Sequence, residues 1–365
     1  MESFFTESPS LKFKSSPCAA DRRQGPVESL SVPSSSRSRQ ASALAVGAVW
    51  AIVVAAAAFL GLRAGFSGPR FADALGVAAA LFAFELFLAL PNVQNAVLAS
   101  FGNRGGALAP LVPLFAVLVY ASTVAGGWPW MLIGAAYAVI PALLLATSRS
   151  KAPGTWEDYA ALLVLWLPVE FRWMYPLFPY PPPLTHTLTI LMALGTGVAA
   201  FVLLRRMQGV GYSLEWRRGF AFHFGFNFLA LSAIAIPLGL KIGFLHWKPA
   251  LPAIRAISLS GPIGAILSGV GILFFTALPE EFLFRGLLQN LLSKSFQNEW
   301  AGLILASVIF GFSHILHAPF PNWKYVFLAT IAGFFYGRAW MKTGSLVPGV
   351  LIHAAVDTLW HILFR

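Results

Sequence analysis

Two adjacent carboxylates and an arginine interrupt a long apolar stretch near the C-terminus. Glu280, Glu281 and Arg285 lie within residues 263–292, which otherwise have the composition of a membrane-crossing helix. Charged groups at membrane depth are costly, so they normally have a partner and mark a functional site. On a helix, Glu281 and Arg285 are one turn apart and can form an ion pair, whereas Glu280 points about 100° away. The spacing therefore leaves Glu280 as the freer carboxylate, suited to act as a general base.

Two later apolar segments carry further candidates at the same spacing. Phe310 and His314 are four residues apart, and so are His353 and Asp357. Asp357 can orient the His353 ring, or both side chains can bind one ligand. Each pair alone is ambiguous, because buried ion pairs and packed histidines also occur as purely structural features.

The predicted depths of these groups argue for one shared site. Measured from the helix ends expected on one side of the membrane, Glu280 lies at roughly 18 Å and His314 at roughly 21 Å. His353 and Asp357 lie at roughly 12 and 18 Å on the same scale. Independent structural residues need not coincide in this way, so we expect three helices to bring their polar groups together.

The composition defines the elements that must position these residues. The chain is 58% hydrophobic and only 11% charged, with a mean hydropathy of +0.72. Apolar runs long enough to cross a membrane recur along it, and the residue alternation of a membrane β-barrel is absent. These features predict an all-α fold, a polytopic transmembrane helical bundle of about 10–11 spans. The expected spans are residues 41–62, 72–92, 106–126, 128–148, 159–175, 185–204, 219–240, 262–292, 300–316, 325–340 and 345–364.

One of these spans is open to a second interpretation. Pro168, Glu170 and Arg172 interrupt the segment 159–175. Proline and charged residues at membrane depth are tolerated where a segment is re-entrant or lines a cavity. The segment could therefore cross the membrane or only enter it.

The chain divides into three predicted parts. Residues 1–40 are rich in Ser, Pro and Arg and are expected to form a disordered tail. Residues 41–204 form an N-terminal transmembrane bundle with few ionisable groups, and residues 205–365 form a catalytic domain whose motifs lie in 262–365. Lys and Arg are more frequent in the loops on the side of the N-terminus, which predicts a cytoplasmic N-terminus.

The charge and the cysteine content exclude several classes of protein. The net charge of +11 is spread over loops between spans, which favours contact with the lipid bilayer and its anionic headgroups and argues against nucleic acid as a partner. Cys18 is the single cysteine, so an intrachain disulfide and a cysteine metal cluster are excluded.

The remaining ionisable residues of the apolar segments belong to no motif. His317 and His361 lie near the ends of their predicted spans and are expected at the membrane interface. Glu85 and Glu170 could be accessory carboxylates or hydrogen-bonded helix contacts, and His186 has no motif around it.

The order of the three motifs resembles the CPBP family of intramembrane proteases. The motifs are Glu280-Glu281-x-x-x-Arg285, then Phe310-x-x-x-His314, then His353-x-x-x-Asp357. That family includes type II CAAX prenyl endopeptidases and bacterial proteins linked to bacteriocin self-immunity. The resemblance implies an intramembrane endopeptidase that hydrolyses a peptide bond of a membrane-associated peptide or protein substrate, prenylated if it is of the CAAX type.

The resemblance also implies a role for each motif residue. Glu280 would activate water together with His314, and His353 with Asp357 would stabilise the oxyanion or complete a metal site. The family allows Asn or Asp at the position of Asp357, and an ionised Asp357 would repel an oxyanion, which favours orientation of His353 or metal ligation. Three further residues would support the geometry: Glu281, Arg285 and Phe310.

Two chemistries and two other classes of function stay open at this point. His314, His353 and Glu280 could hold a zinc ion with one position free for water, or the same groups could work without metal as a glutamate and histidine pair. Intramembrane Glu and His are also used by proton- or ion-coupled transporters. A non-catalytic immunity or scaffold protein could retain the fold.

Overall fold

The computed structural model describes residues 36–108, 110–122, 127–178, 182–248 and 262–364. The secondary structure of this part is helical, apart from one isolated bridge between Trp247 and Phe364. The predicted tail, residues 1–40, lies outside the described residues except for the beginning of α1. The N-terminal helices are α1 (Ser36–Arg63), α2 (Pro69–Leu88), α3 (Pro91–Leu108), α4 (Leu111–Tyr120), α5 (Trp128–Ser148), α6 (Trp156–Glu170), η2 (Tyr175–Leu177), α7 (Pro182–Gly197) and η3 (Val198–Leu204).

The C-terminal helices begin with α8 (Phe220–Lys241) and include the long helix that carries the glutamate pair. That helix consists of α10 (Pro262–Ile272), η4 (Leu273–Ala277), α11 (Leu278–Glu281), η5 (Phe282–Gln289) and α12 (Asn290–Ser295). The last three helices are α13 (Glu299–Phe312), α14 (Trp323–Thr343) and α15 (Leu346–Leu363).

In the part of the chain that the structure describes, seven helices are long and apolar enough to cross a membrane. The chain is therefore a multi-pass membrane protein with an all-α fold, as predicted. The seven are Gln40–Arg63, Pro69–Leu88, Trp128–Ser148, Leu184–Leu204, Phe220–Lys241, Gly264–Ser295 and Leu346–Leu363. The other predicted spans correspond to α4, α6, α13 and α14, which are shorter or more polar. The sequence did not indicate α3 as a separate helix.

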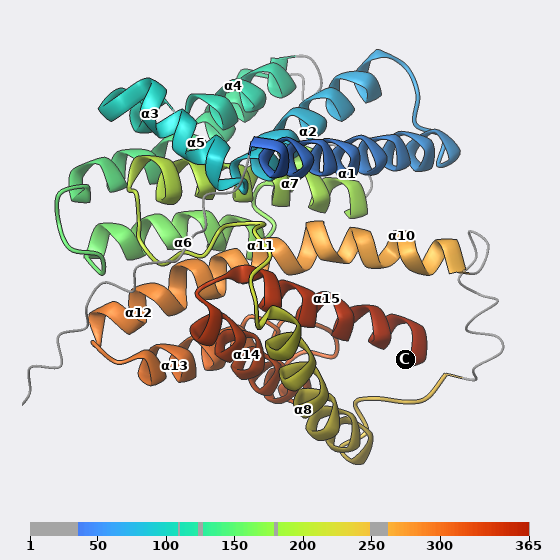
Figure 1. The fold of residues 1–365 in the computed structure, drawn as a ribbon. Coiled ribbons are helices and arrows are strands. Elements are labelled where there is room, and N and C mark those ends of the chain that lie inside the picture. Colours follow the sequence, from blue (N-terminus) through green and yellow to red (C-terminus); the bar gives the residue numbers. More distant parts are fainter. Residues whose placement is uncertain (1–35, 109, 123–126, 179–181, 249–261, 365) are drawn as a thin grey trace, which may run out of the picture.

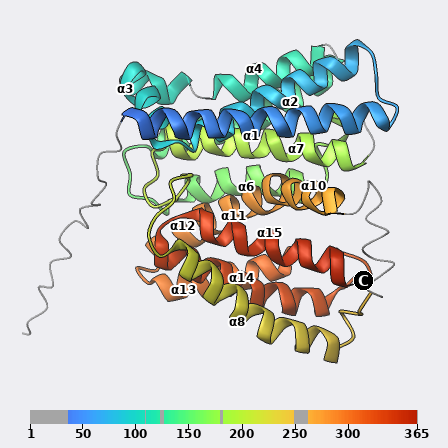
Figure 2. The same cartoon turned by 45° about the vertical axis from the view of Figure 1, so that its right-hand side comes forward.

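The helices lie in layers with their axes roughly aligned (Figures 1 and 2). Helices α1 to α5 form one side of the bundle, and α8 with α13 to α15 forms the other. Helices α6 and α7 lie between them in both views and face the helix with the glutamate pair. Most of α7 and η3 is buried in the hydrophobic core, since 83% of an apolar 18-residue stretch within Leu184–Leu204 is buried.

A glycine brings the two halves of the molecule into close contact. A Cβ atom added at Gly197 of α7 would lie 2.7 Å from the ring of Phe282. That distance is shorter than a van der Waals contact, so only glycine allows α7 to pack this closely against the glutamate helix. The first half therefore forms a wall beside the predicted catalytic segment.

The glutamate helix has two π-helical segments, which the sequence did not predict. Segment η4 precedes and η5 follows the short α11 that contains Glu280 and Glu281. Pro279 cannot donate a backbone hydrogen bond, which removes one helical contact beside the pair. π-Helical turns are rare and frequently accompany functional sites.

A buried ion pair between Arg205, which follows η3, and Asp158, in the first turn of α6, holds the loop between α5 and α6. Arg205 Nε donates to Asp158 Oδ1 at 2.8 Å, and Arg205 also donates to the carbonyls of Arg149, Lys151 and Ala152. Asp158 accepts from the backbone N–H of Gly154 at 2.8 Å and forms a capping box at the start of α6. This pair fixes the loop that begins α6.

Candidate active site

A buried arginine anchors the site on one side. Arg285 Nε lies 3.1 Å from Glu281 Oε2, and both side chains are 1% exposed. Arg285 Nη2 donates to the carbonyl of Gly333 at 3.2 Å. The guanidinium lies 4.3 Å from the ring centroid of Phe310 and 5.3 Å from that of Tyr336, in the geometry of cation–π contacts. Phe310 thus supports the arginine that neutralises Glu281.

His353, from α15, lies among three carboxylates. Its Nδ1 is 3.0 Å from Glu281 Oε1, and its Nε2 is 3.5 Å from Asp357 Oδ2 and 3.8 Å from Glu280 Oε2. Tyr336 stacks on the ring with centroids 4.7 Å apart, and His353 is only 3% exposed. Both ring nitrogens therefore face acceptors, and only the imidazolium can donate on both sides.

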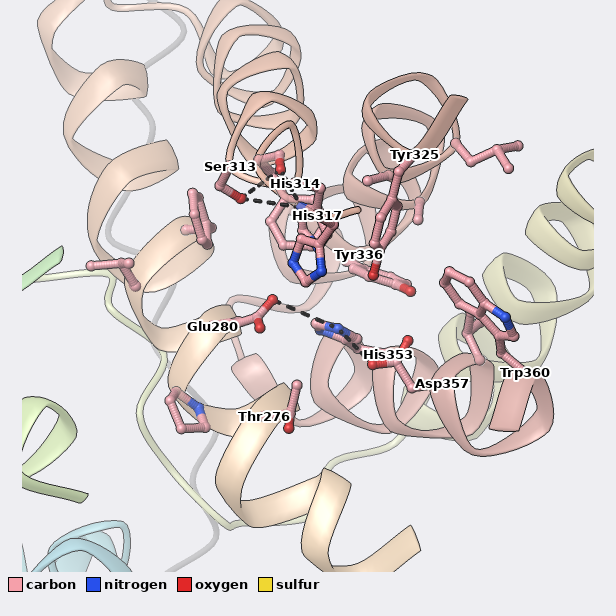
Figure 3. Close-up of a pocket in the computed structure, with 18 of the residues that line it drawn as sticks. Thr276, Glu280, Ser313, His314, His317, Tyr325, Tyr336, His353, Asp357 and Trp360 are labelled. Atoms are coloured by element: carbon pink, nitrogen blue, oxygen red, sulfur yellow. Dashed lines mark hydrogen bonds and ion pairs between the residues drawn. The ribbon is translucent and has the colours of Figure 1, made fainter. Parts of the chain in front are cut away.

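The two glutamates have different surroundings. The Glu280 side chain is 30% exposed, whereas that of Glu281 is 1% exposed. Within the described residues, Glu280 Oε2 has no hydrogen-bond partner. Figure 3 shows Glu280 facing the open space that His353 and Asp357 also border. Glu280 is the carboxylate that is available to a substrate or a water molecule.

His314 lies in the turn beyond α13, not within the helix as the predicted span 300–316 implied. The helix ends at Phe312, and Ser313 is its C-cap. His314 Nδ1 lies 2.8 Å from the carbonyl of Phe310, an acceptor that fixes the hydrogen on Nδ1. The lone pair of Nε2 is then free to accept a proton. The ring also contacts Tyr325 at a centroid distance of 4.5 Å.

The more exposed of these groups border one cavity of about 910 Å³, whereas Glu281 and Arg285 lie behind its lining. Its lining includes Glu280, His314, His353 and Asp357, so the structure brings the residues of the three motifs together. His317 lines it as well and stacks on His314 at a centroid distance of 5.6 Å.

Sequence reasoning missed several residues that line this cavity. Tyr325 and Tyr336 of α14 face it together with Trp360 of α15 (Figure 3). Helices α6 and α7 add a further wall, which includes Trp166 and Ile190. Aromatic residues in an apolar segment give no signal for such a role, and the walls from α6 and α7 depend on long-range packing that no local pattern encodes.

The arrangement of donor atoms does not fit a zinc site well. Among the residues that the structure describes, no three His, Cys, Asp or Glu side chains converge as metal ligands. Both nitrogens of His353 face carboxylates, so neither directs a lone pair at an ion. Zinc bound by Glu280, His314 and His353 stays a prediction.

Comparison with known protein families agrees with the motifs. Residues 262–359 match the family model described as Type II CAAX prenyl endopeptidase Rce1-like. The match contains every residue of the three motifs and confirms the resemblance to the CPBP family of intramembrane proteases. Searches of curated proteins and of solved structures found no match to the chain.

Proposed function

We propose that the protein is an intramembrane endopeptidase that hydrolyses a peptide bond of a membrane-associated substrate of the prenylated CAAX type. The observation that carries this proposal is the partly exposed carboxylate of Glu280, which faces a cavity that His314 and His353 also line. The family match of residues 262–359 supports the same reaction class and the same kind of substrate.

The first step is the activation of water. Glu280 accepts one proton from a water molecule, and His314 Nε2 accepts a hydrogen bond from the same water and orients it. The water oxygen attacks the scissile carbonyl carbon and forms a tetrahedral intermediate with a negatively charged oxygen. Glu280 then returns the proton to the leaving amine as the C–N bond breaks. The products are a carboxylic acid and an amine, and Glu280 is again a carboxylate.

Glu281 and Arg285 hold His353 in place during these steps. Glu281 contacts Arg285 on one side and His353 Nδ1 on the other, so it links the buried arginine to the histidine that lines the cavity. Asp357 contacts His353 Nε2 and orients the ring. As a carboxylate, Asp357 is unsuited to donate a hydrogen bond to an oxyanion.

Tyr325 is the neutral donor we assign to the oxyanion. Its ring contacts His314, its side chain lines the cavity, and no hydrogen bond of its hydroxyl is found within the described residues. Figure 3 shows the hydroxyl directed toward the space between His314 and His353. Loss of one oxyanion donor costs about 10²–10³ in kcat, so Tyr325→Phe should lower kcat by about a hundredfold and leave KM unchanged. An unchanged kcat would remove Tyr325 from the mechanism.

The apolar part of the cavity is suited to the lipid chain of such a substrate. Helices α7 and α8 line it with aliphatic and aromatic side chains: Ile190, Leu194, Phe228 and Leu231. A prenyl chain against these residues would place the adjacent peptide beside Glu280.

The decisive experiment compares the wild type with Glu280→Gln in lipid nanodiscs, using a farnesylated peptide as substrate. Glutamine keeps the shape of the side chain but cannot accept the proton, so activity should fall by about 10²–10⁴. The thermal unfolding temperature should stay unchanged. Glu215→Gln is the matched control, because Glu215 is half-exposed and lies outside the cavity.

Retained cleavage by correctly folded Glu280→Gln protein would refute the mechanism. Ion or solute flux in proteoliposomes with no peptide cleavage would instead favour a transporter. An unaltered cellular role of a His314→Ala, His353→Ala double variant would favour a non-catalytic scaffold.

A further inference from the structure

The cavity continues past the motif residues to a polar border formed largely by the connection between α6 and α7. This border contains Arg172 and Tyr175 from the connection, His186 from α7 and His317 from the turn after α13. We call Arg172, His186 and His317 the basic rim. Arg172 and His186 lie outside the segment that matches the family model, so that match assigns them no role.

Arg172 is held in an unusual backbone conformation. Its φ of 58° lies in the left-handed region, which non-glycine residues rarely adopt. The turn is closed by a hydrogen bond from the backbone N–H of Tyr175 to the carbonyl of Arg172 at 3.1 Å. The guanidinium lies 5.7 Å from the ring centroid of Tyr175. Strained residues of this kind concentrate at binding sites.

The side chains of the basic rim act on one another. The Tyr175 hydroxyl lies 3.2 Å from His186 Nδ1, which leaves His186 Nε2 for another partner. Partial burial and, to a smaller extent, the charge of Arg172 lower the pKa of His317, whose ring stacks on that of His314 at a centroid distance of 5.6 Å. The basic rim is thus in contact with His314 through His317.

Arg172 has no ion-pair partner among the described residues. The nearest carboxylate on its own segment, Glu170, accepts a hydrogen bond from Trp166 Nε1 at 3.1 Å and forms no ion pair with Arg172. Glu170 offsets part of the positive charge without occupying the guanidinium. The rim therefore offers hydrogen-bond donors at the end of a mainly apolar cavity.

We propose that the basic rim binds the C-terminal carboxylate of the peptide substrate, with the Arg172 guanidinium as its charged member. This inference rests on the proposed peptidase function. An occupant of an apolar cavity with a cationic border should be apolar with one anionic end, and a short apolar C-terminal peptide has this character. The planar guanidinium can bind a carboxylate through two hydrogen bonds, and the histidines can add a third.

The test uses two farnesylated peptides that differ only at the end, one with a free carboxylate and one with a carboxamide. A hydrogen bond to a charged group changes affinity by about tenfold or more. The wild type should therefore cleave the carboxylate peptide with a KM about tenfold lower. Arg172→Gln should raise that KM by about tenfold, leave kcat unchanged and leave the carboxamide peptide unaffected.

Lys241→Gln is the matched control. It removes one positive charge at the end of α8, outside the cavity lining, and should change neither KM. Equal KM values for the two peptides in the wild type would overturn the proposal. An equal rise for both peptides in Arg172→Gln would also overturn it, since that result indicates a lipid headgroup contact or a general distortion.

A binding measurement separates this inference from the proposed function. Fluorescence anisotropy of the labelled peptides on Glu280→Gln protein needs no turnover. The Glu280→Gln protein should bind the carboxylate peptide more tightly than the carboxamide peptide, and the double variant that also carries Arg172→Gln should bind both equally. This result would support carboxylate binding by the basic rim even if the wild type cleaves neither peptide. Cleavage of both peptides without any preference would leave the peptidase proposal intact and refute the rim.

Discussion

Two buried arginine–carboxylate pairs, one in each half of the molecule, are built differently. Arg205 and Asp158 are surrounded by backbone carbonyls and N–H groups that complete their hydrogen bonds. Arg285 and Glu281 also form a close pair, but Arg285 Nη1 and Glu281 Oε2 lack hydrogen bonds among the described residues. The first pair fixes a loop, whereas the second shares its carboxylate with His353, which lines the cavity. The surroundings of an ion pair therefore reveal more about its role than its distance does.

The largest expected effect is a loss of protein stability when the pair of Arg205 and Asp158 is broken. Asp158→Ala leaves Arg205 buried without its carboxylate, and removal of one partner of a buried pair typically costs about 3–5 kcal/mol. We expect a loss of this size in the unfolding free energy in detergent micelles. The kcat of the folded fraction should be unchanged. Glu215→Ala, which breaks only the exposed pair with Arg217, should cost less than about 1 kcal/mol. A fall in the kcat of folded Asp158→Ala protein would contradict a purely structural role for the pair of Arg205 and Asp158.

The same pair predicts a dependence of stability on acid. Burial alone would raise the pKa of Asp158, but hydrogen bonds from Arg205 and from the Gly154 N–H lower it below its usual value. Its contribution to stability is fully present above about pH 4 and is lost as the pH falls through the lower folded-state pKa. Thermal unfolding from pH 7 to pH 3 should show this loss. The difference between the wild type and Asp158→Asn should shrink as the pH falls, and a constant difference would contradict the assignment.

A smaller effect is expected at Asp357. Asparagine keeps an oxygen that can contact His353 Nε2 and removes a negative charge near the developing oxyanion. Asp357→Asn should therefore retain at least about a tenth of the wild-type kcat/KM. Asp357→Leu should lose about 10–100-fold because nothing then orients the ring. Equal losses in the two variants would show that the charge itself is required.

The smallest effect is expected from metal removal. Because the described donor groups do not converge on one point, dialysis against a chelator should change kcat by less than a factor of about two. Elemental analysis of the purified protein provides the second measurement. Bound zinc at one ion per chain, with activity lost on chelation and restored by zinc, would establish the zinc hypothesis instead.

The sequence predicted the features that depend on local chemistry. Charged groups are so costly in an apolar segment that Glu280, His353 and Asp357 are recognisable as partners from their positions in the chain alone. The pairing of Glu281 with Arg285 follows from their spacing on a helix, and the structure shows that contact. The contact between Glu281 and His353 joins two helices, so the spacing within one helix could not reveal it.

Other features depend on packing between distant segments. The π-helical segments around the glutamate pair have no propensity signal that would separate them from an α-helix. Arg172 and His186 face the cavity because α6 and α7 pack against the glutamate helix, where Gly197 permits close approach to Phe282. His314 was predicted at the correct spacing from Phe310, but the end of α13 at Phe312 was not.

The volume of the cavity has a consequence for the supply of water inside the bilayer. At about 30 Å³ for each molecule of liquid water, a space of about 910 Å³ can hold on the order of thirty molecules. A lipid-linked peptide that fills the apolar wall expels most of them and leaves only the polar corner at Glu280 hydrated. The substrate and the water molecule that hydrolyses it therefore compete for space in the same cavity. A substrate chain too bulky for the cavity would exclude the water molecule that is needed to cut it.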